Sequence, residues 1–351
     1  PPRSTLFPYT TLFRSTHDVR VFTGAPELPL FTFPDATIHA EYFFEVPFNR
    51  ADRTKTPSSV IAIGLPPGMV MDTLTGTITG RPNKFKKGGY AVKIVVSNSF
   101  GSVEQTAILN VNDLSGTLAG VWTGVMERNA VLNTGLGGRL DFTVTTLAAY
   151  SGKLTLGGVT YSFKGILDVG PVTSKITATI PLKGKPVPPP LVLTLTLQGN
   201  EVLEGMVTNG TDECELLSGW RGIWGKKAPL VPATEYAGYH TFGAALPAGS
   251  PLLGSTDVPQ GSGYGSFTIA VDGKLKIAGR MPDGEAISLS TFLGPDGGIG
   301  IFQVMYKAIK PGGSLLGSLE LTTGGNADPA DNTLMSDDLT WVRPADRKSV
   351  V

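Results

Sequence analysis

The chain has 351 residues, a formal net charge of zero, 41% hydrophobic residues, and a high content of glycine (45 residues) and proline (27 residues). These values exclude a disordered chain, because disordered chains combine low hydrophobicity with high net charge. The absence of a basic excess argues against nucleic-acid binding, which depends on neutralising phosphates. No apolar run approaches the ~20 residues that a membrane-spanning helix needs. The length corresponds to about two or three domains.

Two short terminal segments do not look like natural sequence. Pro1–Ser15 resembles one reading frame of a common sequencing-library adapter, and Asp346–Val351 resembles the same adapter read from the opposite strand. We treat both segments as adapter artefacts and leave them out of the fold prediction. We therefore expect the natural reading frame to continue beyond both ends, so a signal peptide is not observable in this sequence.

Short runs rich in β-branched and aromatic residues recur along the chain between turn residues. Examples are Tyr90–Val96, Leu140–Thr145 and Phe267–Val271. Asn-Gly and Asp-Gly pairs such as Asp272-Gly273 lie between such runs and tolerate the positive φ of tight hairpin turns. Helical periodicity is hardly visible, so we predict an all-β chain of sandwiches or barrels.

The first predicted domain covers residues 26–113. Four spaced motifs follow one another in it: GLPPGMVMD, TGTITGRP, GGYAVKIVV and SNSFG. Pro66-Pro67-Gly68 forces a turn between two extended pieces, and Pro82 cannot continue a central strand. The series resembles the Ig-like, cadherin-like repeat of bacterial surface proteins. That resemblance covers about a quarter of the chain and implies a β-sandwich of about seven strands, used as a spacer or an adhesive module.

The same resemblance implies a calcium site at Asn112 and Asp113. Cadherin-like domains can bind calcium at their junctions, and these two residues lie at the end of the domain. Calcium takes ~6–8 oxygen ligands, however, and no acidic cluster upstream supplies them, which favours a polar interdomain turn. A second acidic stretch, Asp328 to Asp338, lacks the ligand order of an EF-hand and is more typical of a solvated loop.

The rest of the natural chain contains two copies of one unit, at residues 116–229 and 236–345. The matched pairs, separated by 117 to 125 residues, are Trp122 with Tyr239, Phe142 with Phe267, Gly152 with Gly273, and Trp220 with Trp341. This period is longer than that of solenoid repeats, so we predict that each copy is a small β-barrel or β-sandwich of about eight strands. The unit resembles repeats of large exported bacterial proteins, which implies no defined activity.

The sequence contains no recognisable catalytic constellation. Its histidines are His17, His39 and His240, and it has neither a nucleophile elbow nor a phosphate-binding loop. His240 lies in a predicted strand without partners for general-base work. The single cysteine, Cys214, lies among carboxylates that would raise its pKa. A catalytic pair of carboxylates, as in glycosidases, stays an alternative, because the sequence gives no distances between the candidates Glu127, Asp141, Glu201 and Glu204.

The aromatic residues are the best candidates for a binding site. All four tryptophans lie in the duplicated region, and exposed aromatic faces can stack on sugar rings. Trp122, Trp224 and Tyr264 each have a glycine within two residues, near expected strand ends, so we predict that they are exposed and bind a glycan. Trp220 and Trp341 hold matched positions in the two copies and are expected in the core.

Together these observations predict a non-enzymatic fragment of a large exported bacterial protein, located at the cell surface or outside the cell. An Ig-like β-sandwich followed by two related small β-barrel or β-sandwich domains would act as a spacer or adhesion scaffold. The expected partners are polysaccharide or other surface proteins, without nucleic acid, membrane span or cofactor apart from calcium. The alternative function is a carbohydrate-binding accessory region of a secreted polysaccharide-active enzyme.

Overall fold

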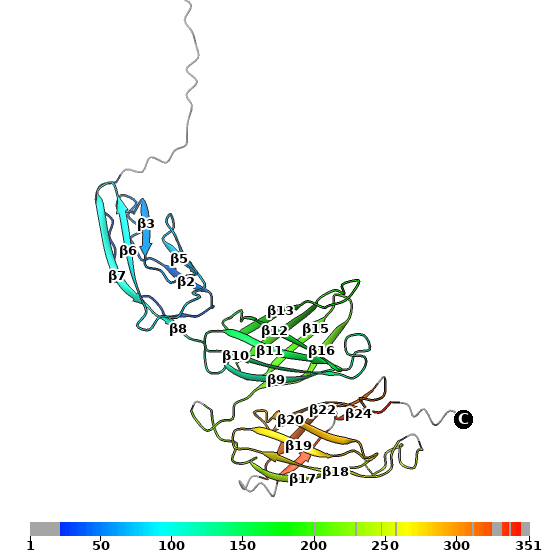
Figure 1. The fold of residues 1–351 in the computed structure, drawn as a ribbon. Helices are drawn as coiled ribbons and strands as arrows, with labels where there is room; N and C mark the ends of the chain where they lie inside the picture. Colours follow the sequence, from blue (N-terminus) through cyan, green and yellow to red (C-terminus); the bar gives the residue numbers. More distant parts are fainter. Residues whose placement is uncertain are drawn as a thin grey trace, which may run out of the picture. The chain divides into compact units, whose positions relative to one another are not determined.

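The computed structural model describes residues 22–344 except 200, 229, 247, 257, 311, 325–331 and 337, and it divides into two compact units (Figure 1). Strands are the only regular secondary structure of the described residues, which confirms the predicted all-β fold. None of these residues forms a helix long and apolar enough to cross a membrane. The adapter-like segments 1–15 and 346–351, and also His17, lie outside the described residues.

The first unit comprises residues 22–35, Tyr42–Gly80 and Lys86–Asn110, and it contains two antiparallel sheets (Figure 1). One sheet has the order β2 (Tyr42–Glu45), β5 (Thr77–Gly80), β4 (Met69–Asp72). The other has the order β3 (Ser59–Ile63), β6 (Tyr90–Asn98), β7 (Gly101–Leu109). Val60, Ile78 and Ile94 are fully buried members of the core. Because side chains alternate between the faces of a strand, each sheet buries one face and exposes the other.

The second unit comprises residues 36–41, 81–85 and the chain from Val111 onwards. Its first pairing joins β1 (Ala36–Thr37) in parallel with β8 (Val111–Asn112). Ala40 forms an isolated parallel bridge with Val169, and Arg81 forms ion pairs with Glu41 and Asp168. These short segments therefore pack with the duplicated region.

The first copy is a nearly closed barrel. Its strands are β9 (Gly120–Met126), β10 (Gly138–Val144), β11 (Ala149–Leu156), β12 (Val159–Ile166), β13 (Thr173–Ile180), β14 (Leu191–Gln198), β15 (Leu203–Thr208) and β16 (Glu213–Arg221). They form an eight-stranded sheet in the order β12-β11-β10-β9-β16-β15-β14-β13, in which all neighbours are antiparallel (Figure 1). The alternating Leu and Thr residues of β14 show which face of this sheet encloses the core: the leucines are buried and the threonines are not.

The edges of this sheet, β12 and β13, close the barrel without a continuous ladder. At one end Asp168 and Lys175 exchange two backbone hydrogen bonds of 2.9 Å. Further along, Tyr150 of β11 reaches across the seam, and its hydroxyl donates to the carbonyl of Thr177 on β13 at 3.4 Å. Gly165 of β12 makes room for this crossing, since a Cβ there would lie 2.5 Å from the Tyr150 hydroxyl oxygen.

The second copy repeats most of this order but is less closed. One sheet contains β17 (Gly238–Ala244), β18 (Gly263–Ile269), β19 (Lys274–Arg280) and β20 (Ala286–Phe292); the other contains β21 (Gly298–Met305), β22 (Gly313–Thr322), β23 (Thr333–Met335) and β24 (Thr340–Val342). Both β23 and β24 pair with β22, so they act as one interrupted strand. The amide side chain of Gln303 bridges the seam between β20 and β21, donating to Ala286 O at 2.9 Å and accepting from Ser288 N at 2.8 Å.

Strand register corrects two of the matched pairs. Trp122 is paired with Phe142 between β9 and β10, and the same place between β17 and β18 is held by His240 and Phe267. The structural counterpart of Trp122 is therefore His240 and not Tyr239, which lies on the opposite face, because a slip of one residue reverses every side chain. The match of Trp220 with Trp341 is also wrong: Trp220 lies in β16, which pairs with β9, whereas Trp341 lies in β24, which pairs with β22.

Candidate functional site

Trp122, predicted to be exposed, is fully buried in the first barrel, so that prediction is wrong. Its ring stacks on Phe142 with centroids 6.1 Å apart and planes 8° apart, and its Nε1 donates to Leu118 O at 3.0 Å. Gly120 does mark the start of β9, but Trp122 lies on the face of this strand that points into the barrel. Trp122 is a core residue that offers no face to a ligand.

Trp224 packs against the core of the second copy, although it follows the last strand of the first. Its Nε1 donates to Gly294 O at 3.0 Å, and its ring meets Tyr236 edge-on at 5.6 Å. A Cβ at Gly273, in the turn between β18 and β19, would lie 2.6 Å from the indole. This half-buried tryptophan therefore joins the copies.

Tyr264 is 64% exposed and lies on the outer face of β18. Its register neighbours are Gly243 on β17 and Arg280 on β19. Gly243 leaves one side of the ring open, since a Cβ there would meet no atom within 4 Å. The structure does not bring the three predicted glycan contacts together: Trp122 lies inside a barrel, Trp224 in the connection, and Tyr264 on an outer face. Binding of a glycan by Tyr264 stays a prediction.

The predicted calcium residues adjoin the pairing of β1 with β8. Asn112 lies opposite Thr37 in this pair, and Asp113 follows it as an exposed residue. Among the residues that the structure describes, no three His, Cys, Asp or Glu side chains are grouped to hold a metal ion. Calcium binding by Asn112 and Asp113 therefore stays a prediction. In the second acidic stretch, Asp338 accepts from the backbone and hydroxyl of Ser318, while Asp328, Asp331 and Asp337 lie outside the described residues.

Cys214 is held by the barrel as a buried thiol. Its Sγ accepts from Asn133 Nδ2 at 3.4 Å and donates to Glu127 O at 3.3 Å. Burial and, to a lesser degree, the charge of Glu127 raise the pKa of Cys214 to about 12. A thiol with this pKa stays protonated at neutral pH, so Cys214 is unsuited to nucleophilic chemistry.

Two of the candidate carboxylates are partners of arginines. Asp141 forms an ion pair with Arg139 at 2.8 Å and also accepts from the Thr123 hydroxyl. Glu201 forms an ion pair at 2.9 Å with Arg221, whose side chain is buried. These contacts give both carboxylates a structural role. His240 also has structural contacts, because it stacks on Phe267 with centroids 4.7 Å apart.

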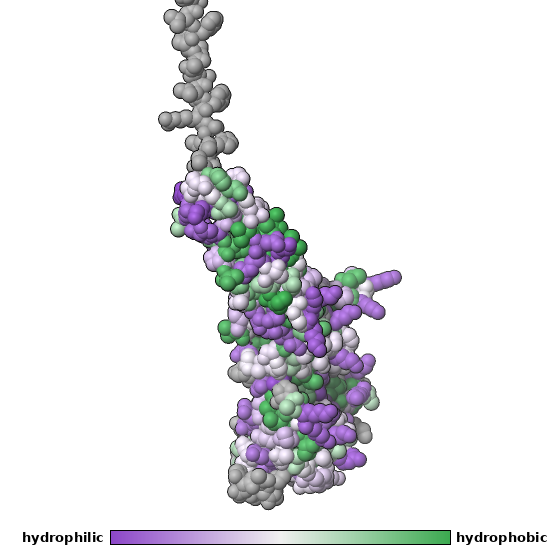
Figure 2. Space-filling model, turned by 90° about the vertical axis from the view of Figure 1, so that its left-hand side faces the viewer, coloured by the Kyte–Doolittle hydropathy of each residue, from purple (hydrophilic) through white to green (hydrophobic). Residues whose placement is uncertain are grey.

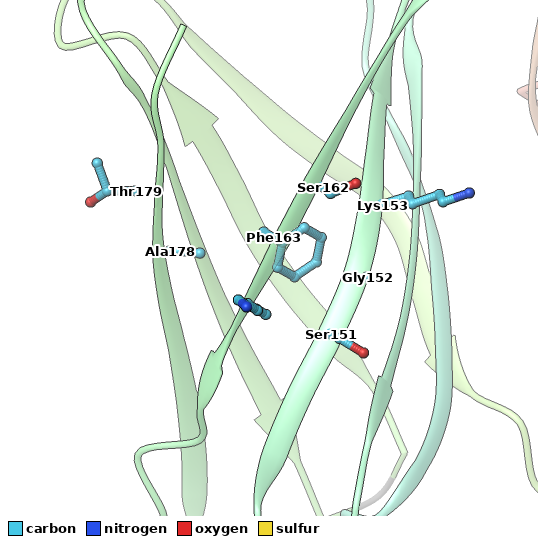
Figure 3. Close-up of a pocket in the computed structure, with 8 residues that line it drawn as sticks. Ser151, Gly152, Lys153, Ser162, Phe163, Ala178 and Thr179 are labelled. Carbon is cyan, nitrogen blue, oxygen red and sulfur yellow. The ribbon is translucent and has the colours of Figure 1, made fainter.

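A hollow of about 520 Å³ opens on the barrel of the first copy, at residues of β11, β12 and β13. Figure 3 shows Phe163 and Ala178 facing one another across the space between β12 and β13, while Lys153 and Thr179 point away from the ring. Gly152 and Ala178 are small residues, and their size leaves space beside Phe163. Sequence reasoning missed this hollow because it arises where two strands meet without a ladder.

Arg128 is a second feature that the sequence analysis missed, and it joins the two copies. From the end of β9, its guanidinium donates within its own copy to Gly135 O at 3.1 Å and Leu136 O at 3.2 Å. It also donates to Ser314 O at 3.3 Å, to the Ser314 hydroxyl, and to Thr340 O at 3.1 Å in the second copy. Burial lowers the pKa of the Arg128 guanidinium.

Apolar contacts accompany this arginine. Val125 of β9 packs in a small buried cluster with Phe302 of β21 and Leu316 of β22. The Trp220 ring lies against glycines of the second copy, since a Cβ at Gly294 would be 3.0 Å away from the ring. The outer surface differs from these buried contacts: on the face shown in Figure 2, small hydrophobic patches lie among hydrophilic residues.

In the comparisons with known proteins, a family model matches the first part of the chain. Residues 33–112 match a family model described as "Putative Ig domain", which confirms the Ig-like resemblance of residues 26–113. An Ig-like domain is consistent with a surface or adhesion module, and such domains are typically non-catalytic. No curated protein matches the sequence.

Solved structures give weaker similarities. A Bacteroides fragilis protein described as a "putative alpha-galactosidase/melibiase" is 24% identical, with a TM-score of 0.23, over 29% of this chain and 20% of its own. The N-terminal eight Ig domains of Down Syndrome Cell Adhesion Molecule are 10% identical, with a TM-score of 0.17, over 77% of this chain and 41% of theirs. Sidekick-1 immunoglobulin domains 1–5 are 12% identical, with a TM-score of 0.17, over 77% of this chain and 80% of theirs. This chain thus spans less than half of the first two structures.

Proposed function

We propose that this chain is a non-catalytic part of an exported bacterial surface or extracellular protein, in which it acts as a spacer and adhesion scaffold. The observation that carries the proposal is the joint between the two copies of the duplicated unit. A spacer must resist bending, and two barrels connected only by a flexible linker would not. Here polar and apolar contacts hold the copies together.

Arg128 favours a joint that resists bending because its contact is multidentate. The planar guanidinium of Arg128 directs several N–H donors in fixed directions, so its carbonyl and hydroxyl partners in both copies can be satisfied only in one arrangement. Separation of the copies would leave these donors and acceptors to water and would expose the cluster around Leu316. Both effects favour the closed joint.

A distance measurement between spin labels tests the rigid joint. We would attach the labels to Cys residues that replace Lys164 on β12 and Lys276 on β19, both exposed; the buried Cys214 would stay unlabelled. A narrow distance distribution is expected, and Arg128→Met should broaden it, whereas Arg280→Met on the outer face of β19 should not. A broad distribution in the unsubstituted chain would rule out the spacer role.

Export and surface location form a separate part of the proposal. The Ig-like family match at residues 33–112 supports them, because Ig-like domains often mediate protein interactions. Long-read sequencing of the source DNA through this locus tests this part. We expect an export signal and further β repeats in the same reading frame. A catalytic domain directly adjoining these residues would instead make the chain an accessory region of an enzyme.

Carbohydrate binding is the second candidate function, and the exposed ring of Tyr264 supports it. The open side next to Gly243 and the neighbouring Arg280 give this ring an apolar face beside a hydrogen-bond donor, which suits a sugar. Titration with a polysaccharide panel, followed by tyrosine chemical shifts, tests this function. Tyr264→Ala should abolish the response, and Tyr239→Ala, which removes another exposed tyrosine, should not. A response that survives Tyr264→Ala would exclude this site.

A further inference from the structure

The connection between β13 and β14 is long for a hairpin. Ile180 and Leu191 are partners in the register of these strands, so residues 181–190 form the loop between them. Hairpin connections usually have ~2–5 residues. Half of this loop is proline, at positions 181, 186, 188, 189 and 190. The loop is therefore longer than strand pairing requires, and its composition restricts the conformations that it can adopt.

Polar contacts do not tie this loop to the rest of the barrel. Within the described part of the chain, residues 181–190 form no hydrogen bond and no ion pair. The corresponding hairpin of the second copy, between β21 and β22, is shorter and is held in place. Its Tyr306 donates from the backbone N–H to Glu285 Oε1 at 3.1 Å and from the hydroxyl to Asp283. The first copy thus carries a loop that its own fold does not use.

The second half of the loop favours the polyproline II conformation. Every residue of 186–190 except Val187 is a proline. Proline fixes its own φ at about −65° and drives the residue before it toward extended or polyproline II values, so Val187 is restricted as well. A polyproline II helix has about three residues per turn. Pro186 and Pro189 therefore lie on one face of this run, and Val187 and Pro190 lie on the next.

The exposure of the run agrees with this periodicity. Pro188, on the third face, is half-buried and lies beside Gly184, where an added Cβ would be 3.0 Å from the Pro188 ring. The other residues of the run are exposed: Pro186, Val187, Pro189 and Pro190. We call these four residues the proline ridge. Since the side chain of Val187 is 75% exposed, the ridge presents apolar surface to water on two adjoining faces.

Two lysines precede the proline ridge. Lys183 and Lys185 are exposed, and Lys185 is joined to Pro186 by a cis peptide bond. Neither lysine forms an ion pair with another described residue. The loop therefore combines an apolar ridge with two ammonium groups that no carboxylate of the barrel neutralises.

We propose that the proline ridge binds a partner protein whose groove is lined by aromatic rings and bordered by carboxylates. Aromatic grooves recognise proline-rich segments because such segments are already extended, so binding costs little further ordering of the backbone. Carboxylates beside the groove pair with Lys183 and Lys185, which makes the partner electrostatically complementary to the loop. The proposal depends neither on the rigid joint between the copies nor on sugar binding at Tyr264.

The test uses the full chain and a panel of isotope-labelled SH3 domains that carry carboxylates beside their aromatic grooves. Chemical shifts of the groove residues should show saturable binding, with a Kd below ~1 mM for at least one domain. Pro189→Ala removes a ring from the ridge and frees the backbone, so it should weaken binding at least about tenfold. Pro181→Ala, which changes an exposed proline of the same loop outside the ridge, is the matched control and should leave binding unchanged.

Charge reversal tests the carboxylates of the partner. Lys183→Glu should weaken binding about threefold, whereas Lys276→Glu, on an exposed position of β19, should leave it unchanged. Val187→Asp gives a second disruption of the ridge, and circular dichroism of each variant verifies its fold. Absence of binding to every domain of the panel at ~1 mM would overturn the proposal. Equal binding by Pro189→Ala and the unsubstituted chain would overturn it as well.

Discussion

The two copies of the duplicated unit share a strand order but reach different degrees of closure. In the first copy, eight strands form one sheet whose edges meet at a single seam, between β12 and β13. In the second copy, the corresponding seam lies between β20 and β21, and a further opening separates β17 from β23–β24. The comparison teaches that β16 closes the first copy on this side, because it pairs with both β15 and β9.

The copies also differ in how they fill equivalent positions. Trp122 in the first and His240 in the second both stack on a phenylalanine of the next strand, but only Trp122 is fully buried. At the shared seam, Tyr150 provides the bridge in one copy and Gln303 in the other. The same backbone thus tolerates different side chains where the packing around them has changed.

The largest expected effect distinguishes the two stacked positions. Trp122→Ala should lower the free energy of unfolding by ~3–5 kcal/mol, because it leaves a cavity in a closed core. His240→Ala should cost only ~0.5–1.5 kcal/mol, since its ring is half-buried. Urea unfolding of the full chain, followed by circular dichroism, measures both values. Tyr239→Ala is the control for an exposed ring, and equal losses for Trp122→Ala and His240→Ala would contradict the comparison.

The next effect concerns the joint between the copies. Arg128→Met should reduce stability by ~2–3 kcal/mol, because the carbonyl groups of the buried residues Leu136 and Ser314, one in each copy, lose a charged donor. Arg128→Lys should not restore it, since a compact ammonium group cannot reach all of these acceptors. In calorimetry we expect the two copies to unfold in one transition in the unsubstituted chain and in two transitions in Arg128→Met. Arg280→Met, on an outer face, should change neither quantity, and an unsplit transition in Arg128→Met would show that the copies are coupled by other contacts.

A smaller effect is expected at the seam of the first barrel. Gly165→Ala should cost ~1–3 kcal/mol, because the added methyl group would collide with the hydroxyl of Tyr150. Gly158→Ala is the matched control, since a Cβ there would meet no atom within 4 Å, and it should stay within ~0.5 kcal/mol. Thermal unfolding of both variants measures the difference. Equal stability of the two variants would mean that Tyr150 does not close the seam.

The smallest effect is the pH dependence caused by Cys214, which the second copy lacks. Folding raises the pKa of this thiol from 9.0 to about 12. Between these values the unfolded chain releases the proton and the folded chain retains it, so the thiol's contribution is complete below pH 9 and decreases as the pH rises. The stability difference between the unsubstituted chain and Cys214→Ala should therefore fall as the pH rises from about 9 to about 11. Urea titrations measure this difference, and a constant value would contradict the raised pKa.

Much of the fold could be predicted from local sequence patterns. Asp272-Gly273 marks the turn between β18 and β19, and the alternating residues of β14 mark a strand with one buried face. The Ig-like motifs mark residues 26–113, and the family model matches residues 33–112 within this range. These signals are local, because turn geometry and the period of a strand depend on a few consecutive residues.

The candidate sites depended on contacts that no local pattern describes. Trp122, with its neighbouring glycines, resembles Tyr264 in sequence, yet register buries the first and exposes the second. The sequence next to Arg128 does not signal its role, because its acceptors Ser314 and Thr340 are about 200 residues away. Such long-range contacts require the folded chain.

The sequence by itself determined the all-β class, the Ig-like segment and the duplication, because hydrophobic periodicity, turn chemistry and spaced motifs can be recognised from the order of the residues alone. The tertiary structure alone decided which aromatic residues are buried, how Arg128 joins the copies, and where the second barrel is open. Burial depends on strand register, and barrel closure depends on whether distant edges pair. Both are properties of the assembled sheet, in which a shift of one residue exchanges core for surface.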